Sequence, residues 1–104
     1  MTIYGLSQSS GAERRLTVEM GGEGVVLTVT DHASGGELGR VVVPQAELVS
    51  ALVAPPAGGA TVGGARPVGV EVCRNEVLLR GSGWDAAVGL DDLRDALEGV
   101  IPAG

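Results

Sequence analysis

The sequence predicts an α+β fold: a tandem βββα repeat with antiparallel sheet strands and two helices packed on one face. Two observations predict it. Apolar and polar residues alternate through residues 16–30 and again through residues 68–80, as in strands with one buried face. Each stretch precedes an apolar stripe at helical spacing, at residues 48–53 and 90–101. Because one-sided strands and helices must bury their apolar faces, each helix is expected to cover a sheet.

The first repeat is expected over residues 15–54. Its strands are predicted at residues 16–20, 25–30 and 40–43. Pro44 is expected to open the helix, since proline suits the first helical position. The pair Pro55-Pro56 is expected to end it. Ahead of this repeat, residues 2–6 are predicted to form a short strand or an ordered arm.

The second repeat is expected over residues 67–101, after a Pro/Gly-rich linker at 55–66. Its strands are predicted at residues 68–73, 77–80 and 84–88, and its helix from residue 90 onward. The two repeats align with a length difference that falls in the loop after Thr30, where insertions are tolerated. The 104 residues are expected to form one domain.

Composition narrows the classes of partner and compartment. The net charge is −6, and all seven basic residues are arginine, so a general attraction to nucleic acid is not expected. A single cysteine indicates a reducing compartment. No signal peptide or membrane span is recognisable, so the cytoplasm is expected. The absence of Lys and Phe suggests a GC-rich genome, such as that of an actinobacterium or its phage.

Residues capable of catalysis or metal binding are sparse. Asp31, His32 and Ser34 share one loop, but a catalytic triad needs its acid to orient the histidine from a separate position. One His and one Cys are too few for a zinc site. The glycine-rich stretch at 58–64 lacks the lysine of a phosphate-binding loop. We therefore predict a non-enzymatic protein with no catalytic residue, cofactor or metal.

The sheet face away from the helices is the candidate interaction surface. Its residues mix polar, charged and aliphatic side chains, which is typical of partner contacts but also of a threonine-rich solvent face. The residues of this candidate surface are Thr17, Glu19, Thr28, Thr30, Glu71, Cys73, Leu78 and Arg80. Trp84 alternates with Ala86 and Val88, which favours a core position over a base-stacking one.

The order of elements over residues 15–101 resembles the Whirly-type fold. That fold is shared by single-stranded-DNA-binding transcription factors and by the SsgA-like sporulation and cell-division regulators of actinomycetes. The Lys-rich DNA-contacting motif of the Whirly family has no counterpart here. We expect a small protein-binding or regulatory module that forms a homodimer and does not enter membranes.

The alternative implied by the resemblance is a single-stranded nucleic-acid-binding protein. It requires the arginines to converge on one face of the fold. The arginines concerned are Arg14, Arg15, Arg40, Arg66, Arg74 and Arg80.

Overall fold

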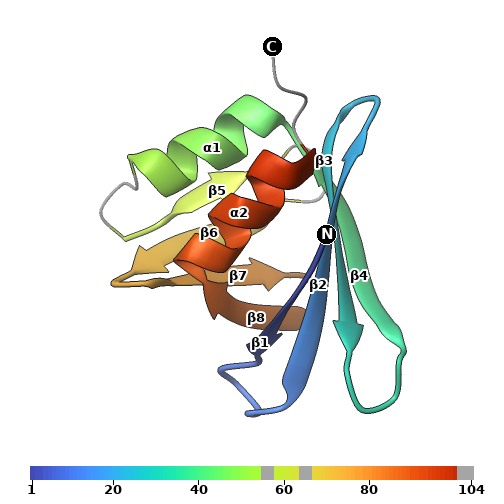
Figure 1. Cartoon of the computed structure of the whole chain (residues 1–104). Helices are drawn as coiled ribbons and strands as arrows, with labels where there is room; N and C mark the ends of the chain where they lie inside the picture. Colours follow the sequence, from blue (N-terminus) through green and yellow to red (C-terminus); the bar gives the residue numbers. More distant parts are fainter. Residues whose placement is uncertain (55–57, 64–66, 101–104) are drawn as a thin grey trace.

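One eight-stranded sheet and two helices make up the part of the chain that the computed structural model describes, residues 1–54, 58–63 and 67–100 (Figure 1). The strands lie in the order β4-β3-β2-β1-β8-β7-β6-β5, and all neighbours pair antiparallel. The elements are β1 (Thr2–Leu6), β2 (Glu13–Gly21), β3 (Gly24–Asp31), β4 (Glu37–Val43), α1 (Gln45–Val53), β5 (Ala60–Val62), β6 (Val68–Cys73), β7 (Glu76–Gly81), β8 (Trp84–Gly89) and α2 (Leu90–Val100).

The sheet curls strongly, so that the β4 end approaches strands far from it in the strand order (Figure 1). Trp84 of β8 shows this curvature, because its indole packs against Gly39 of β4 although three strands separate β4 from β8. The two halves of the sheet join at β1, which pairs along its whole length with β2. Its pairing with β8 comprises only Gly5 with Val88 and Leu6 with Ala87.

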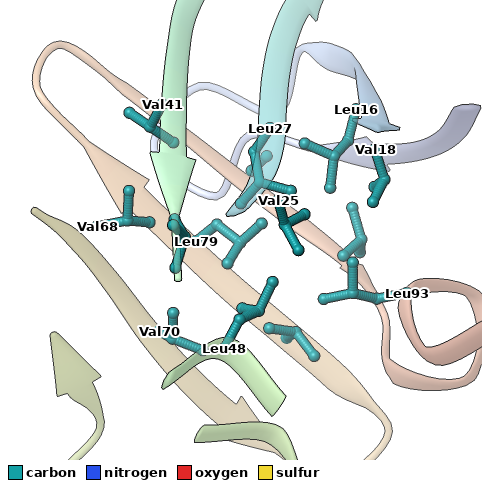
Figure 2. Close-up of a cluster of buried hydrophobic side chains, with 14 of the residues drawn as sticks. Leu16, Val18, Val25, Leu27, Val41, Leu48, Val68, Val70, Leu79 and Leu93 are labelled. Carbon is teal, nitrogen blue, oxygen red and sulfur yellow. The ribbon is translucent and has the colours of Figure 1, made fainter. Parts of the chain in front are cut away.

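Alternate residues of the strands fill the interior of the curled sheet. Leu16 and Val18 of β2, Leu27 of β3 and Leu79 of β7 are fully buried there, and Leu48 of α1 enters the same cluster (Figure 2). This core contains almost no aromatic side chain, since β-branched and aliphatic residues supply nearly all of it. The alternation read from the sequence is thus the pattern that the sheet buries.

The prediction of a tandem βββα repeat with two helices packed on one face is wrong. Four strands precede each helix, and all eight strands belong to one continuous sheet. α1 does not cover the strands that precede it, and α2 packs across both halves of the sheet. α1 makes its main strand contacts with β5 and β6, while α2 contacts β2, β1, β8 and β7. The reason is the curvature, which turns both halves of the sheet toward a shared interior that each helix helps to fill.

Several element boundaries also differ from the sequence prediction. Ala60–Val62, inside the segment predicted as a linker, forms β5 and pairs with β6. Pro44 stands just before α1 as its cap residue, and its carbonyl accepts a hydrogen bond from the Leu48 amide at 3.1 Å. The predicted residues 55–57, 64–66 and 101 lie outside the described part of the chain. Neither described helix is long and apolar enough to cross a bilayer.

Candidate functional site

A groove of about 700 Å³ lies between β4 and the region where β7 ends and β8 begins, with Pro67 beside it. One wall is β4 itself, and the other wall is built around the β7–β8 turn. The lining residues are Leu38, Gly39, Arg40, Val41, Pro67, Arg80, Gly81, Ser82 and Trp84. The groove thus combines the edge of the sheet with side chains that come from the opposite end of the strand order.

Trp84 lines the groove but is only 8% exposed. The Nε1–Cε2 edge of its indole ring lies against both Gly39 and Gly81, so a methyl group at either glycine would overlap the ring. The prediction that Trp84 is a core residue is confirmed. Its aromatic edge nevertheless lines the groove, which the alternation pattern alone did not indicate.

The charges along the groove are of one sign. Arg40 and Arg80 line it from opposite walls, and none of the described residues that line it is acidic. Arg40 lies near Glu37, with 3.8 Å between Nε and Oε1, but both side chains are largely exposed and such a pair contributes little. In a chain with a net charge of −6, this groove is therefore a local positive site.

The groove runs beside an open sheet edge. β4 pairs only with β3, and no other described backbone group hydrogen-bonds to its free side. Leu38 and Val42 on this strand are 39% and 43% exposed. An edge strand with one free side and exposed aliphatic side chains is a template for pairing with another chain.

The candidate surface predicted from the sequence falls into two separate groups. Four of its residues lie on β2 and β3, where Thr17 pairs with Thr28. The other four lie on β6 and β7, where Glu71 pairs with Leu78. The strands β1 and β8 separate these groups, and Leu78 is only 8% exposed. The structure brings Arg80 alone into the groove, and sequence reasoning missed Leu38, Gly39, Pro67, Gly81 and Ser82.

Asp85 organises the segment next to the groove. Its carboxylate accepts hydrogen bonds from the Ser7 hydroxyl at 2.6 Å, the Ser9 hydroxyl at 2.9 Å, the Gln8 amide at 2.9 Å and the Ser9 amide at 3.2 Å. The hydrogen bond from the Ser7 hydroxyl is the main cause that lowers the pKa of Asp85 below its usual value. The β1–β2 connection is thereby fixed to the start of β8.

The loop that carries His32 is organised around Asp31. The Asp31 carboxylate binds Arg14 at 3.1 Å and accepts a hydrogen bond from the Ser34 hydroxyl at 2.8 Å, and the latter is the main cause that lowers its pKa. His32 faces other groups, with its Nε2 3.7 Å from Glu13 Oε2 and its ring edge-on to Tyr4. No group of three or more His, Cys, Asp or Glu within residues 1–54, 58–63 and 67–100 is placed to hold a metal ion.

Comparison with known proteins adds no relative: no family model matches the chain, and neither the curated proteins nor the solved structures contain a significant match.

Proposed function

We propose that this protein is a small non-enzymatic protein-binding module that takes up an extended segment of another protein along the free edge of β4. The observation that carries the proposal is the open edge of β4 beside a groove of about 700 Å³. Addition of a strand to an open sheet edge is a common mode of peptide recognition, in which main-chain hydrogen bonds supply affinity and neighbouring pockets supply specificity.

The two walls of the groove suit this mode. β4 is seven residues long, enough for a typical strand, and its backbone groups on the side away from β3 have no hydrogen-bond partner among the described residues. The opposite wall supplies side chains that an added strand would contact, with Trp84 and Arg80 at its centre. A tryptophan and an arginine are among the residues that most often dominate the binding free energy of protein interfaces.

A second copy of the chain is the second candidate occupant, in keeping with the homodimer expected from the sequence. The exposed Leu38 and Val42 favour it, because pairing of two β4 edges would cover both side chains. Such a pair is isologous, so each copy contributes the same strand. Sedimentation equilibrium over a wide range of concentration tests this candidate, and a strict monomer at every concentration removes it.

Single-stranded nucleic acid has less support as a ligand. Of the arginines that it requires, only Arg40 and Arg80 line the groove. Arg14 is paired with Asp31, Arg74 lies in the β6–β7 turn, and Arg66 lies outside the described residues. Trp84 is buried, so its ring is not free to stack on a base.

Blocking the groove tests the proposed function. A displayed library of random peptides is selected on the wild-type protein, and the enriched peptides are then measured against two variants. Ser82→Tyr places a bulky ring in the groove from an exposed turn position, and Ser50→Tyr places the same ring on the exposed face of α1.

Enriched peptides should lose most of their affinity for Ser82→Tyr and keep it for Ser50→Tyr. Circular dichroism serves to verify that both variants are folded. Equal binding to the two variants, or no enrichment over a blank surface, would show that the groove is not a peptide-binding site.

A further inference from the structure

The geometry points to an acidic occupant: we infer that the groove beside β4 recognises an extended strand carrying Asp or Glu side chains that bind between Arg40 and Arg80. This inference rests on the proposed function and names the chemistry of its partner. The described lining of the groove holds two arginines and no acid, in a chain with thirteen acids and seven bases.

The two arginines are placed to act on one ligand. Arg40 belongs to β4 and Arg80 to β7, so the two residues line the groove from opposite walls. Asp85 lies opposite Arg80 in the β7–β8 ladder, but its carboxylate is bound by Ser7, Gln8 and Ser9 and forms no ion pair with Arg80 in the described structure. Arg40 has only the exposed contact with Glu37. A ligand carboxylate between them would make two charge-assisted contacts, and only the weak Arg40–Glu37 contact would be lost in exchange.

A paired strand would present its acids at a regular spacing. Successive side chains of a strand point to opposite sides, so residues two apart share one side. Acids at alternate positions of the partner would therefore all face the arginine side of the groove, while the intervening residues would face away. The partner is thus distinguished by alternating Asp or Glu in an extended segment, and the rest of this acidic protein would repel such a segment.

The test uses short synthetic peptides and the fluorescence of Trp84, which is the only tryptophan of the chain and lines the groove. The first peptide carries Glu at alternate positions with Thr and Val between them. In the second, every Glu is replaced by Gln. The third repeats the first with N-methylated amides that cannot pair with a strand. Oligothymidine and increasing concentrations of the protein itself are measured in parallel.

The Glu peptide should change the emission of Trp84 and bind more tightly than the Gln peptide, with a difference that shrinks as salt is added. Arg40→Gln and Arg80→Gln should each weaken its binding by about two- to fivefold, as expected for partly exposed charge pairs. Arg94→Gln, on the exposed face of α2, is the matched control and should leave the affinity unchanged.

The remaining outcomes separate the inference from the proposed function. Equal binding of the Glu and Gln peptides, with loss on N-methylation, overturns the acidic preference and keeps strand addition at β4. Binding of the N-methylated peptide as tightly as the unmodified one overturns strand addition itself. Preferential binding of oligothymidine, or concentration-dependent self-association that excludes the peptides, assigns the groove to nucleic acid or to a second copy and overturns the inference.

Discussion

Replacing Gly81 or Gly39 by alanine should destabilise the fold through Trp84. Neither glycine has a positive φ, so the backbone accepts an L side chain and only space is at issue. A Cβ at Gly81 would overlap the indole atoms Cε2, Cζ2 and Nε1, and a Cβ at Gly39 would lie 2.6 Å from Cδ1 and closer still to Nε1. Since backbone strands flank both sites, the ring itself must move.

The expected cost is that of overpacking a core, about 1–3 kcal/mol for each variant. For a domain of this size it corresponds to a fall in melting temperature of about 4–8 °C per kcal/mol. Gly69→Ala is the matched control, because its Cβ would lie 3.6 Å from Arg80 Cβ, an ordinary contact. Urea unfolding followed by circular dichroism measures all three free energies of unfolding.

The ring can be identified as the cause by a second comparison. In a Trp84→Leu background the overlapping indole atoms are absent, so Gly81→Ala should cost no more than Gly69→Ala does. The reasoning is refuted if Gly81→Ala is as stable as Gly69→Ala in the wild-type background. It is refuted equally if the cost of Gly81→Ala persists after Trp84 is replaced.

Two further predictions concern α1 and the Asp85 contacts. Leu48→Ala should lower the free energy of unfolding, measured by urea titration, by about 2–5 kcal/mol, because Leu48 is fully buried. Val53→Ala on the same helix is the control: Val53 is 67% exposed, so its replacement should change that free energy by less than about 0.5 kcal/mol. Asp85 has a lowered pKa when folded, so its stabilising contribution is present above the unfolded pKa of about 4 and is lost as the pH falls through the folded pKa. Asp85→Asn should therefore lower the free energy of unfolding by about 1–2 kcal/mol at neutral pH, and the variant should lose less stability in acid than the wild type does. Thermal unfolding of the wild type and the variant at a series of pH values measures this, and a parallel loss of stability in the two proteins would contradict it.

Local patterns predicted the elements but not their assembly. The alternation around Leu16, Leu27 and Leu79 identified β2, β3 and β7, since such a pattern reflects one buried face wherever the strand lies. β5 was missed because three residues, Ala60–Val62, cannot show a period among glycines and prolines. The predicted packing of both helices on one face was wrong, because helix packing depends on the curvature of the whole sheet.

Only single residues of the groove, and not their convergence, could be predicted from the sequence. Arg80 belonged to the predicted surface, and Arg40 appeared among the arginines of the nucleic-acid alternative. Their convergence depends on β4 and β7 facing each other, although β3, β2, β1 and β8 separate them in the strand order. Gly39 and Gly81 gave no signal in the sequence, since each matters only because Trp84 lies against it.

The narrow junction between β1 and β8 has a consequence for how the chain reaches this structure. Gly5 and Leu6 meet Val88 and Ala87 from about eighty residues away, and Gly5 lacks a side chain where a Cβ would overlap the carbonyl of Ala87. Bringing these two segments together lowers the conformational entropy of the chain between them before the contacts at the junction can stabilise the fold. The hairpins on either side are local and form quickly, so this junction is expected to set the folding rate, in the millisecond-to-second range typical of non-local sheets.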